Sequence, residues 1–448
     1  MIVPVTDPAV LEGYLRDASN LRGHAERLYR PRTTAEVAEL LRDCQAQALP
    51  VTVSARRTST TGGPVPMGGA ILSTEQLATV HSLHEVDAGV LLGEFQAHVE
   101  AAGRFFPPDP TSRHECSVGG AIVCNASGSR TFKYGPMRPW VEWVEAVLAD
   151  GTVVQADRST PLPWPVPQWK EPHVKTAAGL YPATNLLDLL IGSEGVLGVV
   201  TRARLRLAPL PPAVLAMLVF LPTRESLLAF LPRARALGPR AIESFDRRAL
   251  DLVRGRLPEV PAADCAVMLE IEHDGEPPLD PWFELLTDVG ALVDDTVVAT
   301  DDTQLHRLHA LRHAVPALVN EIIAHNGVQK VGTDFAVPHD RLGELLALYD
   351  AVPMAAVCFG HIGDSHLHLN LLPRDAEELG RARALYFELA RAAVAMGGTV
   401  SGEHGIGRLK KAHLALMVPP AVLDGWHQLK ARVDPAGILG RGVMFDRG

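Results

Sequence analysis

Residues 189–207 read LLIGSEGVLGVVTRARLRL and carry three closely spaced glycines, Gly192, Gly195 and Gly198. Two shorter stretches lie upstream, FPPDP at residues 106–110 and GGA at residues 119–121. Glycines at this density let backbone N–H groups approach a pyrophosphate or a flavin ring without interference from a Cβ atom. Each stretch taken alone is more typical of ordinary turns and bulges.

The common nucleotide-binding signatures do not occur in the sequence. No G-x-G-x-x-G follows the first expected strand with an acidic residue about 20 positions later, and there is no G-x-x-x-x-G-K-[ST]. The Rossmann fold and the P-loop fold are therefore disfavoured.

The length and composition indicate a globular chain with an acidic balance. Of its 448 residues, 47% are hydrophobic and 21% charged, which suggests two or three domains and excludes a wholly disordered chain. The 42 Lys and Arg residues against 52 Asp and Glu give a net charge of −10, with no compensating basic block. Because a phosphate backbone requires a clustered positive surface, we do not expect a nucleic acid as a partner.

The cysteines and the amino terminus bear on the cellular compartment. The five cysteines are widely spaced and form no C-x-x-C pair: Cys44, Cys116, Cys124, Cys265 and Cys358. Local iron–sulfur or zinc–thiolate sites are therefore not expected, and the odd count fits reduced thiols. The amino terminus does not resemble a secretory signal, and no stretch approaches the roughly 20 apolar residues of a membrane span. We expect a soluble cytoplasmic protein without a transmembrane segment, with peripheral attachment at the inner face of the membrane left open.

Hydrophobic periodicity predicts an α+β chain without internal repeats. Helices are expected at residues 34–49, 224–237, 301–323, 340–349, 376–396 and 420–433. Strands are expected at residues 50–54, 140–148, 152–155, 214–221 and 266–272, and an Asp-Gly turn joins the second strand to the third. The Pro- and Trp-rich residues 157–185 are expected to form a long surface loop, and the prolines of residues 205–212 to mark a domain boundary.

Residues 358–370, CFGHIGDSHLHLN, hold a group of histidines. Apolar and polar residues alternate at the end of this stretch, so a strand there places His366, His368 and Asn370 on one face. His361 precedes a Gly-Asp turn that can fold it back toward the same face. Because neutral imidazoles are the commonest metal ligands, the pattern indicates a metal or catalytic site. A solvated polar strand face is the alternative.

Residues 397–407, GGTVSGEHGIG, place Glu403 and His404 among five glycines. A helix is excluded, since each glycine costs about 1 kcal/mol there, and an irregular turn can aim both side chains into a site. Glu403 can complete a metal site of two histidines and one carboxylate, which leaves His404 as a general base with an ordinary pKa near neutrality. The alternative is a helix-capping carboxylate beside an exposed histidine.

Taken together, these stretches resemble a known family. FPPDPTS, SVGGAIVCNASG, KYG, VLADGTVV and LLIGSEGVLGVVTRARLRL occur in the order and at the intervals found in the FAD-linked oxidases of the vanillyl-alcohol oxidase/p-cresol methylhydroxylase fold. GHIGDSHLHLN and GGTVSGEHGIGRLKK resemble the branch that holds D-lactate, glycolate and D-2-hydroxyglutarate dehydrogenases. The resemblance extends from about residue 25 to residue 445.

The resemblance implies a specific domain organisation and a bound, non-covalent FAD. An FAD-binding domain of two α+β subdomains is expected at residues 1–208, an α+β cap domain at residues 209–400, and a segment that returns to the FAD domain at residues 401–448. The residues implied in FAD binding are Ser54, Ala55, Arg56, Arg57, Thr58, Ser59, Pro108, Asp109, Thr111, Ser117, Gly119, Gly120, Asn125, Glu194, Gly195 and Val199.

The resemblance also assigns the chemistry. A divalent metal, zinc or manganese, is implied on His361, His368 and Glu403, with His404 as the base. Further residues implied at the substrate are Asn370, Arg312 and Lys330, and the last two resemble the pair that holds the substrate carboxylate.

Three departures from the family pattern stand out. The first flavin loop usually reads Arg followed by three glycines, whereas this chain has Ser54-Ala55-Arg56-Arg57; the two arginines either weaken FAD binding or pair with its phosphates. Ser365-His366 replaces Gly-Asn, so His366 is an additional candidate metal ligand or substrate contact. Residues 439–442, LGRG, replace the usual Asn-Pro pair.

The expected function is the oxidation of a D-2-hydroxy acid, of the D-lactate, glycolate or D-2-hydroxyglutarate type, to its 2-oxo acid by an FAD-dependent dehydrogenase or oxidase. Without an iron–sulfur motif, electrons would pass directly to a quinone, an electron-transfer flavoprotein, a cytochrome or oxygen. Two alternatives stay open: a flavin subunit of a multi-component glycolate oxidase, and a flavin-poor binding protein. A homodimer is compatible with either enzyme interpretation.

Overall fold

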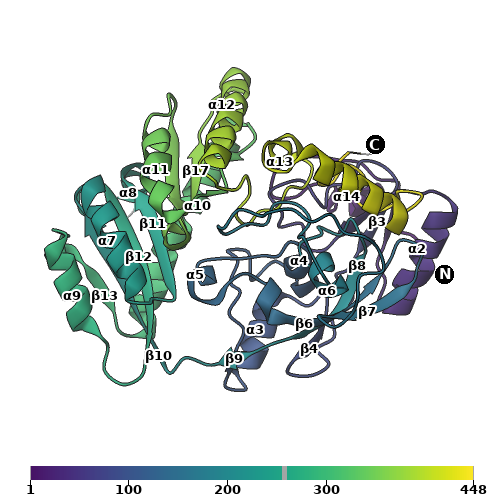
Figure 1. Ribbon diagram of the computed structural model, residues 1–448, viewed down its shortest axis with the longest axis horizontal. Helices are drawn as coiled ribbons and strands as arrows, with labels where there is room; N and C mark the ends of the chain where they lie inside the picture. Colours follow the sequence, from purple (N-terminus) through teal and green to yellow (C-terminus); the bar gives the residue numbers. More distant parts are fainter. Residues whose placement is uncertain (1, 255–259, 447–448) are drawn as a thin grey trace.

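The computed structural model describes residues 2–254 and 260–446. Figure 1 shows two halves side by side, one formed by the purple and blue part of the chain and the other by the teal and green part. The yellow carboxyl-terminal segment crosses back over the first half. Helices and sheets occur in both halves, which confirms the expected α+β class.

The amino-terminal half contains two small sheets. The first is parallel, with the strand order β1 (Arg27–Tyr29), β3 (Ala70–Ser73), β2 (Val51–Ser54). The second is antiparallel, with the order β4 (Glu85–Asp87), β8 (Val199–Leu205), β6 (Val141–Val147), β7 (Val153–Asp157). The two-residue strands β5 (Arg104–Phe105) and β9 (Ala208–Pro209) pair separately. The predicted hairpin at the Asp-Gly turn is the β6–β7 pair.

Several helices of this half begin at a side chain that caps the first turn. In α2 (Thr34–Ala46), the Thr33 side chain accepts a hydrogen bond from the backbone N–H of Glu36 (3.2 Å). The helix starts as predicted and ends three residues earlier than expected. The other helices of the amino-terminal half are α1 (Pro8–Glu12), α3 (Leu92–Glu100), α4 (Val118–Val123), α5 (Thr131–Tyr134), η1 (Arg138–Trp140) and α6 (Leu186–Leu190).

The second half is built on one large antiparallel sheet. Its strand order is β13 (Val297–Ala299), β10 (Ala213–Leu221), β12 (Cys265–His273), β11 (Ala241–Asp246), β16 (Ala356–Gly360), β17 (His366–Leu371), β14 (Val331–Gly332), and β15 (Phe335–Ala336) also pairs with β17. Along β10, residues 215, 217 and 219 belong to one apolar cluster and residues 216, 218 and 220 to another. Both faces of the sheet are therefore covered.

The two faces carry different helices. One apolar cluster unites the sheet with α7 (Arg224–Ala236), α9 (Leu279–Asp288), α11 (Leu342–Asp350) and α12 (Ala376–Ala395). The other unites it with α8 (Arg247–Arg254) and α10 (Asp302–Asn326). Short 3-10 helices lie at η2 (Val293–Asp295), η3 (His339–Arg341) and η4 (Ile362–Asp364). Among the described residues, no helix is long and apolar enough to cross a membrane.

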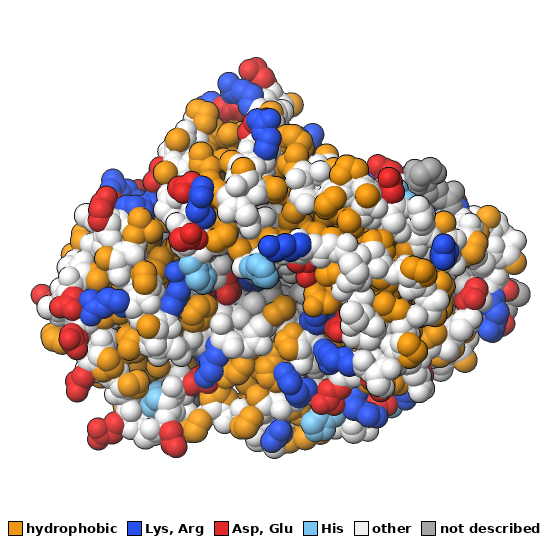
Figure 2. All heavy atoms as spheres, viewed as in Figure 1, with side chains coloured by type: hydrophobic (Ala, Val, Ile, Leu, Met, Phe, Trp, Pro, Cys, Tyr) orange, Lys and Arg blue, Asp and Glu red, His pale blue; other side chains and the backbone are white. Residues whose placement is uncertain are grey.

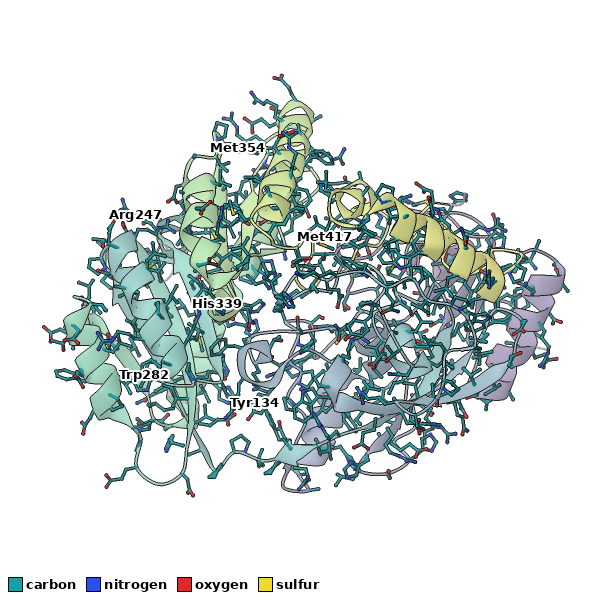
Figure 3. All side chains as sticks on the ribbon, in the orientation of Figure 1. Tyr134, Arg247, Trp282, His339, Met354 and Met417 are labelled. Carbon is teal, nitrogen blue, oxygen red and sulfur yellow. The ribbon has the colours of Figure 1, made fainter. Side chains whose placement is uncertain are left out.

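Contacts far apart in the sequence join the halves. Tyr134 points from α5 toward the large sheet (Figure 3), and its hydroxyl donates to Glu272 Oε1 (2.5 Å). The last helices, α13 (Lys411–Met417) and α14 (Pro420–Val433), lead the chain back to the first sheet. There the Val51 N–H donates to the carbonyl of Ile438 (2.7 Å). The domain boundaries at residues 208 and 400 stay a sequence-based prediction.

The long segment after β7 departs from its prediction. Residues 158–185 contain no helix and only an isolated bridge, as expected of a loop. The expected surface position is wrong for the second part, in which Leu180 is buried and the Lys175 side chain is only 4% exposed. This part of the segment is buried because it packs against the glycine-rich turn at residues 397–407. The Ala177 N–H donates to the carbonyl of Ser401 in that turn (2.9 Å). This contact brings Lys175 to the site described next.

Candidate functional site

A cavity of about 1370 Å³ lies between the two halves and is lined by both. On the face shown in Figure 2 the surface between the halves is hollowed, with histidine and basic side chains above the hollow. Most of the residues expected to bind FAD line this cavity, and we call them the FAD-side wall: Ala55, Arg56, Arg57, Thr58, Ser59, Thr111, Ser117, Gly119, Gly120, Glu194, Gly195 and Val199. The residues expected at the substrate and the metal line the same cavity: Arg312, Lys330, His361, His368, Asn370, Glu403 and His404.

Four residues expected at FAD do not line this cavity. The Asp109 side chain accepts from Ser129 Oγ (2.8 Å) and so supports a neighbouring turn. Asn125 Oδ1 accepts from the Arg138 N–H (2.9 Å) and lines a separate, smaller pocket. Ser54 is fully buried, and Pro108 accepts a hydrogen bond through its carbonyl oxygen.

The glycines of the FAD-side wall are needed for close packing. A Cβ atom at Gly119 would lie 2.5 Å from the Cβ of Ala88, and one at Gly120 would lie 3.4 Å from the Cβ of Ala55. The first turn of α4 therefore packs directly against Ala88, which follows β4, and approaches Ala55, which follows β2. Backbone N–H groups along such a wall can reach the phosphates of a dinucleotide, so the residues present fit FAD.

Glu194 connects two of the sequence motifs. Its carboxylate accepts hydrogen bonds from the N–H groups of Ile406 and Gly407, each at 2.7 Å. Glu194 has a left-handed backbone (φ 51°), which turns its side chain toward residues 405–407. The carboxylate expected to contact FAD thus also fixes the turn that carries Glu403 and His404.

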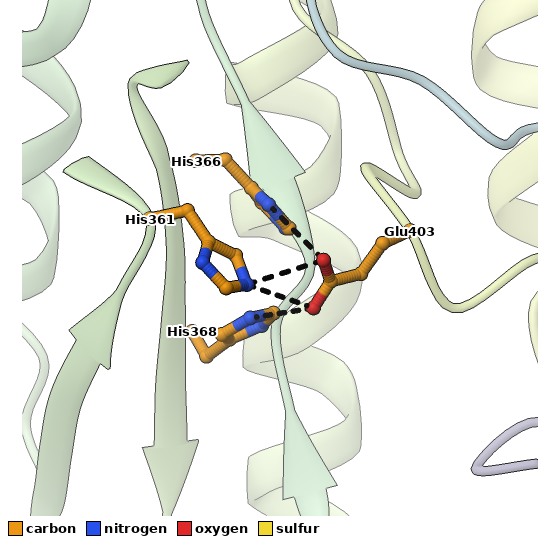
Figure 4. Close-up of side chains that lie close together, drawn as sticks. All are labelled: His361, His366, His368 and Glu403. Atoms are coloured by element: carbon orange, nitrogen blue, oxygen red, sulfur yellow. Dashed lines mark hydrogen bonds and ion pairs between the residues drawn. The ribbon is translucent and has the colours of Figure 1, made fainter. Parts of the chain in front are cut away.

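The histidines converge as the alternation predicts (Figure 4). His361 Nε2 lies 3.2 Å from Glu403, and His368 Nε2 lies 3.2 Å from Glu403 Oε1. With His366, these residues offer three imidazole nitrogens and one carboxylate oxygen, all within 4.8 Å of one another. Since zinc–nitrogen and zinc–oxygen distances are about 2.0–2.2 Å, this donor set fits a divalent cation.

Several supporting residues were missed from the sequence. Glu243 Oε1 lies 2.5 Å from His361 Nδ1, and the carbonyl of Thr333 lies 3.2 Å from His368 Nδ1. Lys175 Nζ donates to Glu403 Oε2 at 2.8 Å. Asp334 accepts from His366 Nε2 at 2.8 Å. An isolated acidic residue within an apolar run, as at Glu243 and Asp334, is the signal that could have indicated a buried and therefore paired carboxylate.

Comparisons with known proteins agree with this geometry. The family model described as FAD linked oxidases, C-terminal domain, matches residues 210–444, and the FAD binding domain model matches residues 25–157. The chain belongs to the FAD-linked oxidase family. As a member of that family it is an FAD-dependent enzyme, and the family resemblance inferred from its motifs is confirmed.

Similar FAD-linked oxidases act on related acids, according to their names. The chain is 33% identical to the mitochondrial D-2-hydroxyglutarate dehydrogenase of Bos taurus, over 97% of this chain and 80% of the relative. It is 29% identical to D-lactate dehydrogenase of Anaerostipes hadrus (97% and 92%) and 28% identical to glycolate oxidase subunit GlcD of Bacillus subtilis (93% and 88%). The fold resembles alkyldihydroxyacetonephosphate synthase, with a TM-score of 0.72 and 14% identity over 98% of this chain and 81% of that one.

Neighbouring charges shift the pKa values of His361 and of the carboxylates around it. Although burial alone would lower the pKa of His361, the carboxylates of Glu243 and Glu403 raise it to about 9. Burial alone would likewise raise the pKa of Glu243, but His361 and Arg312 lower it to about 2. The two carboxylates therefore favour positive charge between them, and a divalent cation bound by the neutral form of His361 would supply that charge in place of the proton.

His404 faces the cavity from the edge of this cluster. Its side chain is 31% exposed, and its ring stacks on His368 with centroids 5.0 Å apart. The backbone N–H of His404 donates to Asp334 Oδ2 (3.0 Å). Desolvation lowers the pKa of His404 to about 4, although Asp334 opposes the shift. This direction departs from the near-neutral pKa expected from the sequence. The imidazole is neutral near pH 7, which is the form that accepts a proton.

The residues expected at the substrate carboxylate approach the cavity from separate elements. Arg312 on α10 donates from Nε to Glu243 Oε2 (3.0 Å), so one edge of its guanidinium is engaged. Lys330 precedes β14, and its Nζ donates to Asn320 Oδ1 (3.2 Å). Burial lowers the pKa of Lys330 to about 8, and no carboxylate among the described residues forms an ion pair with it. A carboxylate ligand would supply the missing counter-charge.

The two arginines of the FAD loop differ in their surroundings. Arg56 reaches toward the carbonyl of Gly89 (Nη2···O 3.4 Å), and its Nε is buried without a hydrogen-bond partner. Arg57 has a left-handed backbone (φ 59°), and its guanidinium stacks on the ring of Tyr14, 4.3 Å from the centroid. Arg57 Nη1 also donates to the carbonyl of Ala55 (3.2 Å), so Arg57 contacts Tyr14 and its own loop, whereas Arg56 keeps a buried Nε donor without a partner.

Proposed function

We propose that this FAD-linked oxidase oxidises a D-2-hydroxy acid to the corresponding 2-oxo acid. The observation that supports it best is that His361, His368, Glu403 and His404 line the same cavity as the loops expected to bind FAD. The names of the similar proteins, which include D-2-hydroxyglutarate and D-lactate dehydrogenases, support this class of substrate.

Each group of residues has a distinct task in the proposed reaction. Arg312 and Lys330 bind the substrate carboxylate and Asn370 contacts the substrate, which fixes the face of Cα that is presented to the cofactor. A divalent cation held by His361, His368 and Glu403 would polarise the hydroxyl group. His404 accepts the hydroxyl proton as C–H bond cleavage proceeds. FAD, when bound, supplies the redox chemistry by accepting the hydride.

The roles of the remaining FAD-side residues follow from their position on the wall. The backbone of residues 54–59 and the Ser117–Gly120 segment would hold the pyrophosphate, and Glu194 would hold the two glycine-rich turns together. Zinc and manganese are the cations that suit two imidazoles and a carboxylate. The electron acceptor, whether a quinone, an electron-transfer flavoprotein or a cytochrome, stays a prediction, as does a homodimer.

Anaerobic bleaching of the flavin tests the proposed reaction. The FAD-loaded protein is mixed with the D- and L-forms of lactate and 2-hydroxyglutarate and with glycolate, with and without a chelator, and absorbance of the oxidised flavin is followed. We expect bleaching by at least one achiral or D-configured acid, and a slower reaction after chelation. Bleaching by the L-acids alone, or by none of these acids, would contradict the proposal.

A second candidate is the flavin subunit of a multi-component glycolate oxidase. The similarity to GlcD of Bacillus subtilis favours it. In that case the isolated chain reduces its flavin with glycolate but turns over with an artificial acceptor only after partner subunits are added. Sustained turnover by the isolated chain would exclude this candidate.

A further prediction concerns the arginines of the FAD loop. Replacing Arg56 with alanine is expected to weaken FAD binding about tenfold to hundredfold, because a charge-assisted hydrogen bond to an anion is worth about 1.5–3 kcal/mol. The matched control is Arg57→Ala, which removes the same charge from the next position, where the guanidinium stacks on Tyr14. Fluorescence titration of the apoprotein with FAD, at low and at high salt, measures the FAD affinity of both variants. If Arg57→Ala loses as much FAD affinity as Arg56→Ala, or more, the two arginines do not differ in their contribution to FAD binding.

A further inference from the structure

We infer that His366 is a fourth protein ligand of the cation held by His361, His368 and Glu403. The inference rests on the proposed function, because it concerns the same cation. It goes beyond it in one respect: the family resemblance implies two imidazoles and one carboxylate, whereas this chain would supply three imidazoles and one carboxylate. In the family pattern that the histidine motif resembles, asparagine stands at the position of His366.

The hydrogen bonding of His366 leaves one ring nitrogen available. Its Nε2 lies 2.8 Å from Asp334 Oδ1, and because a carboxylate accepts, Nε2 is the nitrogen that carries the proton. Nδ1 then holds a lone pair. This atom is buried without a hydrogen-bond partner and lies 4.0 Å from Glu403 Oε2. A buried imidazole oriented by a carboxylate, with its second nitrogen free, is the usual arrangement of a histidine that ligates a metal.

The alternative interpretation, a substrate contact, does not suit this position. The His366 side chain is completely buried and is not among the residues that line the cavity. It sits behind His361 and His368, with ring centroids 5.3 and 4.6 Å from theirs. A substrate in the cavity would therefore meet the other histidines first, whereas a cation between the imidazoles and Glu403 is within reach of all three rings.

Two local features fix the position of the His366 ring. A Cβ atom at Gly402 would lie 2.6 Å from His366 Nε2, so the residue before Glu403 must be glycine for the imidazole to fit beside the carboxylate. Ser365 has a left-handed backbone (φ 52°) and is held by hydrogen bonds of its hydroxyl with Arg235 Nη2 (2.9 Å) and His339 Nδ1 (2.8 Å). These contacts fix the start of β17 and with it the direction of His366.

A competing set of ligands lies next to this one. Asp334, His368, Glu403 and His404 also offer atoms within 4.8 Å of one another. Asp334 is already used by other donors, however, since its oxygens accept from His366, from Ser401 Oγ (2.6 Å) and from Lys410 Nζ (2.8 Å). The set with His366 leaves these three contacts of Asp334 in place.

The cation itself provides the test. The FAD-loaded protein is supplied with zinc, imidazole ligands are counted by X-ray absorption, and zinc affinity is measured by competition with a chromophoric chelator. We expect three imidazoles in the parent protein. In His366→Asn, which restores the residue usual in the family, we expect two imidazoles and at least tenfold weaker zinc binding, because losing a supporting contact alone costs tenfold to hundredfold. His413→Asn, at another buried histidine with unpartnered nitrogens, is the control with unchanged zinc binding.

The outcomes separate the inference from the proposed function. If the parent shows two imidazoles and His366→Asn keeps its zinc affinity while His368→Ala loses it, the fourth ligand is refuted and the proposed metal site stands. If the parent binds no zinc or manganese, both are refuted. Counting imidazoles in the parent needs no variant, so the result does not depend on whether His366→Asn folds.

Discussion

Alanine in place of His404 is expected to slow the reduction of FAD by substrate about 10²–10⁴-fold, the usual contribution of a general base. The imidazole is neutral near pH 7, faces the cavity and stacks on His368. Substrate affinity should change much less, because Arg312 and Lys330 remain to bind the carboxylate. Rapid mixing of the FAD-loaded variant with substrate under anaerobic conditions measures the rate of this half-reaction.

FAD and metal content distinguish this role from a structural one. The contact that holds the turn is made by the His404 backbone N–H to Asp334, and alanine keeps it. The variant should therefore retain both FAD and the cation. His413→Ala, at another histidine that lines the cavity, serves as the control and should reduce its flavin at nearly the parent rate. If His404→Ala does the same, or loses its FAD, His404 is not the base.

The core elements of this fold and site are predictable because their signals are local. The alternation at residues 366–371 predicts β17, since a period of two puts His366 and His368 on the same face. The start of α2 is also predictable from neighbouring residues, because the Thr33 side chain caps the first turn of the helix. The glycines around Glu403 exclude a helix for an equally local reason, and no helix forms there.

The supporting contacts are not predictable in this way because their partners are distant in the sequence. Glu243 and His361 are separated by 118 residues, and Lys175 and Glu403 by 228. Nothing in the residues around Lys175 signals burial, since its segment has no periodicity. Likewise, the sequence predicts Arg312 as a carboxylate ligand but cannot show that Glu243 already accepts from its Nε. A single sequence thus supplies the candidate ligands and leaves their orientation to the tertiary structure.

Asparagine in place of Asp334 is expected to destabilise the folded protein by about 3–5 kcal/mol, the usual cost of leaving a buried charge without its partner. Asp334 is fully buried and Lys410 nearly so, and Lys410 Nζ donates to Asp334 Oδ2 at 2.8 Å. Burial alone would raise the pKa of Asp334, but His404, Lys410 and His366 hold it well below its usual range, so the carboxylate is ionised at neutral pH. Its neutral replacement leaves the Lys410 ammonium unpaired. Urea unfolding of the apoprotein measures the loss.

A second substitution identifies the source of that loss. Lys410→Met removes the buried ammonium and fills the space with an apolar chain of similar length, so the double variant Asp334→Asn/Lys410→Met should be more stable than Asp334→Asn alone. Flavin reduction should stay slow in the double variant, because the anchors of the His404 N–H and of His366 Nε2 are still altered. Recovery of stability without recovery of rate would show that Asp334 neutralises Lys410 and, separately, orients the two histidines. If the losses of unfolding free energy in the two single variants add up in the double variant, Asp334 and Lys410 are not coupled. The destabilisation then has another origin.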